Sequence, residues 1–177
     1  MFWIEADNEV VADQMIRWTA RLAVLTYLVR VAWDVSGSRC PRMARTVRLV
    51  WGMGGILYGL HVLAAFHFLH QWDHVAAWQH VAEQTELATG WRSGVGLWLN
   101  HLVTVIWLVD ASAWAWSLNW SNRPLARWLL HPYISFITFN ATVIFGPPFW
   151  QWVAVILAVS LFVVVRWKRS FCHSPVD

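Results

Sequence analysis

LVWGMGGILYGLHVLAAFHFL, residues 49–69, decides the fold, because it is an apolar stretch without a formal charge. A bilayer core needs about 20 apolar residues in a helix, so this stretch predicts a transmembrane helix. Gly55 and Gly59 are one helical turn apart, with Gly52 nearby, which predicts a flat patch for close contact with another helix. The chain is 58% hydrophobic and 13% charged, whereas soluble domains carry about 25% charged residues. The sequence therefore predicts an all-α integral membrane protein.

Four further apolar stretches predict the rest of a polytopic bundle of five transmembrane helices, in one membrane domain that covers residues 1–177. The last two stretches are separated by Gly146-Pro147-Pro148, which breaks a helix. A single helix through both would reach about 50 Å, whereas the hydrocarbon core is about 30 Å thick. The alternative is four spans with a re-entrant or interfacial helix at residues 133–146. The predicted spans are 16–34, 49–69, 95–116, 129–146 and 149–167.

Basic residues predict the orientation of these spans. Nine of the thirteen lysines and arginines lie in the first loop, the third loop and the carboxy-terminal end, whereas the amino-terminal segment is acidic. With the amino terminus outside and the carboxy terminus in the cytoplasm of an inner or plasma membrane, these nine satisfy the positive-inside rule, and Arg92 alone falls in the second external segment. They lie in short loops rather than on one continuous face, so no nucleic-acid partner is expected. The residues are Arg39, Arg42, Arg45, Arg48, Arg123, Arg127, Arg166, Lys168 and Arg169.

Four of the eight histidines lie between residues 67 and 80, at the predicted outer end of the second span. No glycine or proline occurs between residues 60 and 89, so helix is expected to continue past the membrane edge, straight or with a bend. The part beyond the membrane, about residues 70–89, is predicted to be an interfacial helix.

A helical wheel divides these histidines into two groups. On a continuous helix, His67, His70 and His74 share one face within about 60°. His80 falls on the opposite side, where Glu83 is its neighbour one turn away. The wheel therefore predicts one histidine face and a separate grouping at His80.

His101 lies near the outer end of the third span, at a depth similar to that of His67. Consecutive antiparallel helices pack together, so His67 and His101 are predicted to face each other, as axial ligands of a b-type haem would. A transition metal is the alternative cofactor, because His70 and His74 are one helical turn apart. The predicted metal ligands are His67, His70, His74, His101, His80 and Glu83.

The competing interpretation is a set of interface histidines with packing or proton-sensing roles, because Trp72 and Trp78 mark the same stretch as interfacial. A membrane di-iron oxidation enzyme is disfavoured, because the chain has no His-His pair and its cluster is predicted on the outer side. No Walker loop, Rossmann glycine motif, serine elbow or kinase signature occurs. An enzyme assignment would rest on the histidines alone and stays open.

Arg30, Asp110 and Asn140 are polar residues inside predicted spans, where such side chains face protein or water. Arg30 and Asp110 both lie toward the inner half, which predicts an ion pair that fixes helix packing, or part of an ion pathway. Asn140 is expected to form a hydrogen bond across helices. His61 lies deeper than His67 and is expected to face a different partner, and His131-Pro132 is expected in a solvated loop.

These features support three functional hypotheses. The first is a haem- or metal-binding, redox-linked membrane subunit with its histidine cluster on the extracytoplasmic side. The second is a non-catalytic structural or assembly subunit of a larger membrane complex. The third is a small ion-coupled transporter that uses Asp110. In each case the expected partners are the lipid bilayer and other membrane subunits or further copies of this chain.

Overall fold

The fold is that of a computed structural model, in which all secondary-structure elements of the described residues are helices, as the sequence predicts. The chain divides into two compact units, Met1–Ile137 and Thr138–Asp177, and the features below belong to the first unit unless stated otherwise. The predicted break at Gly146-Pro147-Pro148 and most of the predicted span 149–167 lie outside the described residues. The structure describes residues 2–36, 40–117 and 124–144, with residues 151, 152, 155, 156 and 159.

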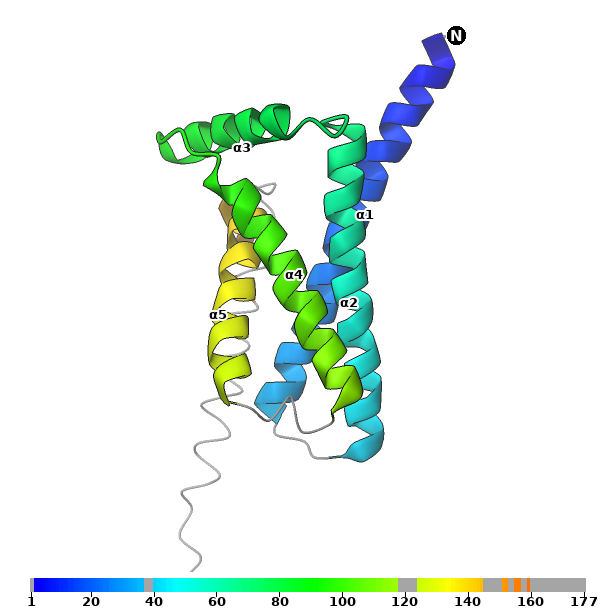
Figure 1. Ribbon diagram of the computed structural model, residues 1–177, viewed down its shortest axis with the longest axis vertical. Coiled ribbons are helices and arrows are strands. Elements are labelled where there is room, and N and C mark those ends of the chain that lie inside the picture. Colours follow the sequence, from blue (N-terminus) through cyan, green and yellow to red (C-terminus); the bar gives the residue numbers. More distant parts are fainter. Residues whose placement is uncertain are drawn as a thin grey trace, which may run out of the picture. The chain divides into compact units, whose positions relative to one another are not determined.

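Three long helices build most of the first unit (Figure 1). Helix α1, Phe2–Ser36, packs along α2, Pro41–Phe68, and α4, Val95–Trp116, packs against α2. Pro41 at the start of α2 suits the first helical turn, where its missing N–H would have no partner in any case. Helix α5, Pro124–Phe139, follows and leads into a π-helical turn, η2, Asn140–Ile144.

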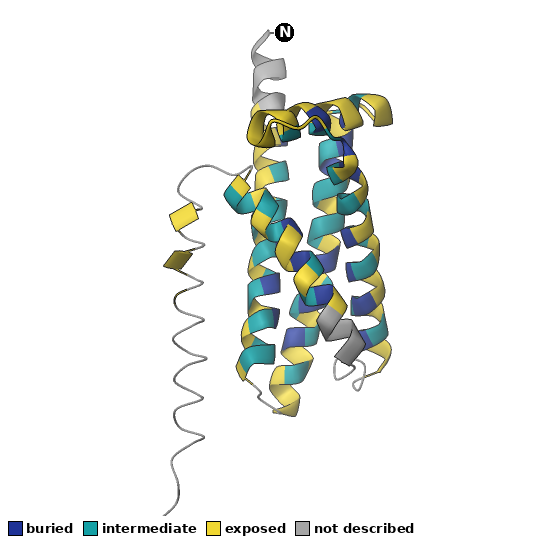
Figure 2. Cartoon of the chain, turned by 90° about the vertical axis from the view of Figure 1, so that its left-hand side faces the viewer, coloured by how far each residue is buried: buried dark blue, intermediate teal, exposed yellow. Residues whose placement is uncertain are grey.

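Helices α2 and α4 are the two described helices long and apolar enough to cross a membrane. They contain the predicted spans 49–69 and 95–116, apart from Leu69, which lies just past α2. Their most apolar windows are only 28% and 22% buried, whereas a core helix of a soluble protein is mostly buried. Exposed positions run along the outer faces of the bundle in Figure 2. These two helices support association with a membrane, and the remaining three spans stay predictions.

The chain turns sharply between α2 and α3, His74–Thr89. Gln71 and Trp72 adopt positive φ angles of 49° and 65°, which are incompatible with a continuing right-handed helix. Helix α3 consequently lies across the ends of α2 and α4 (Figure 1). The straight continuation is therefore wrong and the bend is confirmed, because α2 ends at Phe68. No glycine or proline in the sequence marks this end.

Both ends of α3 are capped by residues whose chemistry suits the position. Asp73 precedes the helix, and its Oδ1 accepts hydrogen bonds from the N–H groups of Val75 at 2.8 Å and Ala76 at 3.2 Å. Gly90 follows the helix with a φ of 77°, the left-handed conformation that glycine adopts without strain. These caps make α3 a separate helix over most of the predicted interfacial segment 70–89.

The core of the bundle is aromatic. The rings of Trp51 on α2 and Trp107 on α4 stack with centroids 4.6 Å apart, and both side chains are buried. Nε1 of Trp107 donates a hydrogen bond to the carbonyl oxygen of Trp51 at 3.1 Å. Tyr27 of α1 adds a third buried ring, 6.3 Å from Trp51 and 6.4 Å from Trp107. Three helices thus meet through these rings. Such close packing matters in a membrane, because lipid is as apolar as the side chains and the hydrophobic effect does not hold helices together there.

Glycines on α2 permit this close approach. A Cβ added at Gly54 would overlap Oγ1 of Thr26 on α1 and lie 2.7 Å from Cζ2 of Trp107. A Cβ at Gly55 would meet Trp107 at 3.2 Å, whereas one at Gly52 would meet nothing within 4 Å. Close contact is therefore confirmed at Gly55, and it extends to Gly54, whereas a Cβ at Gly59 would meet only Thr104, at an ordinary 3.8 Å.

Candidate functional site

The histidines at the α2–α3–α4 junction surround an aromatic ring. Phe66 is 5% exposed, and its ring centroid lies 5.8 Å from that of His70, 4.9 Å from His74 and 5.4 Å from His101. We call Phe66 and the histidines at positions 70, 74, 80 and 101 the Phe66 cluster. The imidazoles of His70, His74 and His101 lie around the buried Phe66 ring at distances typical of aromatic packing.

The imidazole that faces His101 is His74, with ring centroids 6.0 Å apart. His67 points elsewhere: its Nδ1 accepts a hydrogen bond from Nε1 of Trp72 at 3.3 Å, and its ring packs on Phe68 at 4.7 Å. The predicted pair of His67 and His101 is therefore not formed. The reason is the turn after α2, which brings the start of α3 over α4 in the place assigned to His67.

His80 is also placed differently from the expectation. Its ring centroid lies 5.3 Å from that of His70, although ten residues of a continuous helix would separate the two by about 15 Å along the axis. Burial lowers the pKa of His70 below its ordinary value, the imidazole of His80 lowers it further, and the carboxylate of Asp73 opposes both. The neutral form of His70 is thus favoured.

The predicted six-residue metal set is not assembled as one group. Within the part of the chain that the structure describes, no three His, Cys, Asp or Glu side chains lie together as metal ligands. Glu83 instead lies 3.5 Å from Arg92, which also contacts Glu86 at 3.3 Å. Haem or metal binding by these residues stays a prediction without structural support.

A second polar group lies inside the bundle, and we call it the Asp34 centre. It consists of Arg30 and Asp34 on α1 and His131 on α5. Oδ2 of Asp34 accepts a hydrogen bond from Nε of Arg30 at 2.7 Å and lies 2.9 Å from Nε2 of His131. The Arg30 side chain is only 3% exposed, and the Asp34 side chain 13%. One carboxylate oxygen therefore joins two helices through two cationic or proton-carrying partners.

Two tryptophan rings hold the Arg30 guanidinium. Its Cζ lies 4.0 Å from the ring centroid of Trp114 and 5.4 Å from that of Trp51, within the range of cation–π attraction. Nε1 of Trp51 in turn donates a hydrogen bond to Oδ2 of Asp110 at 2.9 Å. The predicted pair of Arg30 and Asp110 is thus replaced by Arg30 with Asp34, one turn away on the same helix. Trp51 contacts both Arg30 and Asp110.

His131 corrects the expectation of a solvated loop at His131-Pro132. It lies within α5, which continues through Pro132, and its side chain is 20% exposed. The hydroxyl of Tyr27 donates to the carbonyl oxygen of His131 at 3.1 Å and lies 2.6 Å from Oγ of Ser135. Pro132 predicts a loop, but it lies inside a helix that contacts α1.

Two nitrogen atoms of the Asp34 centre are buried without a hydrogen-bond partner among the described residues, namely Nη1 of Arg30 and Nδ1 of His131. A buried polar atom that lacks a partner costs free energy, so such atoms are common where a proton or ligand binds. The imidazole can hold a proton at Nδ1 while Nε2 stays bonded to the carboxylate. The arrangement can therefore change charge without losing its contact between α1 and α5.

Two further polar residues lie apart from this centre. Nδ1 of His61 lies 3.0 Å from the carbonyl oxygen of Ile16, so His61 faces α1, as expected of a partner other than His101. Asn140 lies half-buried in η2, in the second unit, and its predicted hydrogen bond across helices stays a prediction.

Sequence reasoning missed Asp34 and His131 as site residues. The spacing of Arg30 and Asp34, four residues apart in a helix, is a detectable ion-pair signal. His131 had no such signal, because its partner is 97 residues away in the chain.

Comparisons with protein-family models, curated protein sequences and solved structures found no match to this chain.

Proposed function

We propose that this chain is a small polytopic membrane protein that binds a proton at the Asp34 centre and couples it to the movement of an ion or solute. The observation that carries the proposal is the single oxygen of Asp34 shared by buried Arg30 and by His131, at 2.7 and 2.9 Å. Ionisable residues within membrane segments are costly and commonly mark proton or ion pathways. The proposal moves the ion-coupled hypothesis from Asp110 alone to the Asp34 centre.

A membrane location is supported by the apolar side chains that the bundle leaves exposed. Leu49, Met53 and Ile56 on α2 are 68%, 59% and 59% exposed, and Val105 and Val109 on α4 are 58% and 60% exposed. Soluble monomers seldom expose contiguous apolar surface of this kind, whereas hydrocarbon covers it at no cost. The five-span topology, with the amino terminus outside, is part of this proposal.

The proton-dependent step depends on the two contacts of Oδ2 of Asp34, one with Arg30 and one with His131. With His131 protonated, Asp34 accepts two charge-assisted hydrogen bonds, one within α1 and one from α5. When His131 loses its proton, the hydrogen bond between α5 and Asp34 weakens, whereas the ion pair of Asp34 with Arg30 within α1 remains. Proton binding would thus change the strength of the contact between α1 and α5, which is a way to couple a proton to helix movement.

A structural subunit is the second candidate, and the tryptophan rings around Arg30 favour it. A guanidinium held between Trp114 and Trp51 is well placed to fix helix packing. Contacts with other membrane subunits or self-association belong to this candidate. The redox-linked hypothesis has less support than either, because His67 does not face His101 and no three possible metal ligands lie together among the described residues. A Soret band or stoichiometric metal in the purified protein would restore it.

Proton flux into liposomes separates the two leading candidates. We expect the reconstituted protein to admit protons after an external pH drop, followed with a trapped pH-sensitive dye, and His131→Gln to lose most of that flux. Glutamine keeps a polar side chain, leaves Arg30 and Asp34 paired, and cannot carry the proton. His61→Gln is the matched control, because His61 also bridges two helices, and it should retain the flux. Equal flux in the wild type and both variants, or none above empty liposomes, would favour the structural subunit.

A further inference from the structure

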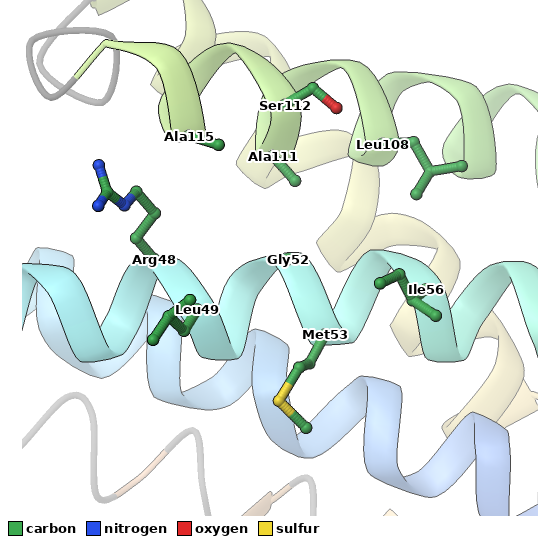
Figure 3. Close-up of a pocket in the computed structure, with 9 residues that line it drawn as sticks. All are labelled: Arg48, Leu49, Gly52, Met53, Ile56, Leu108, Ala111, Ser112 and Ala115. Carbon is green, nitrogen blue, oxygen red and sulfur yellow. The ribbon is translucent and has the colours of Figure 1, made fainter.

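A groove on the outer face of the bundle runs between α2 and α4 and has a volume of about 430 Å³. Small residues line part of it, and longer apolar side chains flank them (Figure 3). Leu49, Met53 and Ile56 on its edge are exposed, so the groove opens to the surroundings. The small lining residues are Gly52, Ala111, Ser112 and Ala115.

Arg48 is the charged residue of this groove. Its side chain extends from α2 across the gap toward the end of α4 that carries Ala115 (Figure 3). It is half-buried, and it makes no hydrogen bond or ion pair with any residue in the described part of the chain. Helix α2 has no acidic residue, and Arg42 and Arg45 precede Arg48 at three-residue spacing. This end of the groove is therefore cationic, and no described residue supplies a counter-charge to Arg48.

We propose that the groove binds one anionic phospholipid, with an acyl chain between α2 and α4 and the phosphate at Arg48. Basic pockets between membrane helices on the cytoplasmic side are suited to anionic headgroups, and the predicted orientation puts Arg48 on that side. An anion there would also offset the unfavourable placement of arginines at the amino-terminal end of α2. The inference rests on the proposed membrane location but not on the Asp34 centre.

A lipid fits the groove better than a second copy of the chain does. In a two-fold dimer the same surface faces itself, so the cationic ends of α2, with Arg42, Arg45 and Arg48, would gather at one interface. Like charges brought together in this way destabilise a contact. A phospholipid supplies both the negative charge and the flexible hydrocarbon that the two parts of the groove require.

Native mass spectrometry of the purified protein in a neutral detergent tests this proposal. Dioleoyl phosphatidylglycerol is the anionic probe, dioleoyl phosphatidylcholine the zwitterionic probe, and inorganic phosphate the headgroup alone. We expect one tightly bound phosphatidylglycerol, and weaker binding of phosphatidylcholine. Arg48→Gln should weaken phosphatidylglycerol binding about fivefold, and Arg45→Gln, outside the groove, should change it far less.

A groove-filling variant tests the acyl-chain part separately. Gly52→Leu projects into open space, since a Cβ there meets nothing within 4 Å, so the variant should fold and lose binding of both lipids. Unchanged lipid binding in both Arg48→Gln and Gly52→Leu would overturn the proposal. So would phosphate binding as tightly as the lipid, or a dimer that Gly52→Leu dissociates without any lipid effect. Lipid binding that persists in His131→Gln, whatever its proton flux, would separate this site from the Asp34 centre.

Discussion

The Phe66 cluster and the Asp34 centre both collect titratable side chains, yet they differ in what surrounds them. Three of the four histidines of the Phe66 cluster lie between positions 70 and 80, all four are half-buried or exposed, and His70, His74 and His101 pack on a hydrocarbon ring. The Asp34 centre joins residues 97 positions apart and encloses an ion pair whose guanidinium is 3% exposed. The many histidines between residues 67 and 80 thus indicate a packing site, the Phe66 cluster. The buried ion pair of Arg30 and Asp34 indicates the better candidate for a functional site.

The largest expected effect is the loss of the Asp34 carboxylate. Asp34→Leu leaves Arg30 buried without its counter-charge, which should lower the free energy of unfolding by about 3–5 kcal/mol. Asp13→Leu removes a pair of the same spacing on the same helix, Arg17 with Asp13, whose side chains are 58% and 56% exposed. That control should cost less than about 1 kcal/mol. Denaturation in micelles measures both, and equal costs would contradict the burial of the centre.

Removal of the ring at the middle of the Phe66 cluster should come next. Phe66→Ala deletes a side chain that is 5% exposed and should cost about 3 kcal/mol. Phe68→Ala, two residues away and 42% exposed, should cost less than about 1 kcal/mol. The same denaturation measurement applies. If Phe66→Ala were as mild as Phe68→Ala, the histidines would not be held by packing.

A smaller effect is expected from pH. The pKa of His70 is lowered in the folded protein, so the unfolded chain binds more protons and stability rises with pH. The contribution is fully present above the ordinary histidine pKa of about 6.5 and is lost as pH falls toward the folded value. Stability measured between pH 5 and pH 7.5 should therefore have a steeper slope in the wild type than in His70→Gln. Parallel slopes would show that His70 is not perturbed.

The smallest expected effect is that of added zinc. If the imidazoles pack around Phe66, Zn²⁺ should leave the unfolding temperature almost unchanged. A metal that binds only the folded protein would raise that temperature with concentration. A clear rise that disappears in His70→Gln or His74→Gln would restore the metal hypothesis and remove the contrast between the two regions.

Sequence reasoning predicted the helical class and singled out Arg30 and Asp110, which are the buried charged residues of the described part of the chain, because composition and apolar run length are local properties. It could not predict how the buried charges pair, since the contact of Asp34 with His131 depends on how α5 docks on α1. The direction of α3 was equally hidden. It depends on a turn at Gln71 and Trp72, neither of which is a typical residue for positive φ.

Imidazole ¹⁵N NMR of the protein in bilayers tests most directly the contact on which the Asp34 centre depends. We expect Asp34→Asn to shift the Nε2 resonance of His131, because Nε2 lies 2.9 Å from Oδ2 of Asp34. The resonances of His80, which lies in the Phe66 cluster, should be the same in both proteins. A His131 resonance that is unchanged by the loss of the Asp34 carboxylate would contradict the proposed proton site.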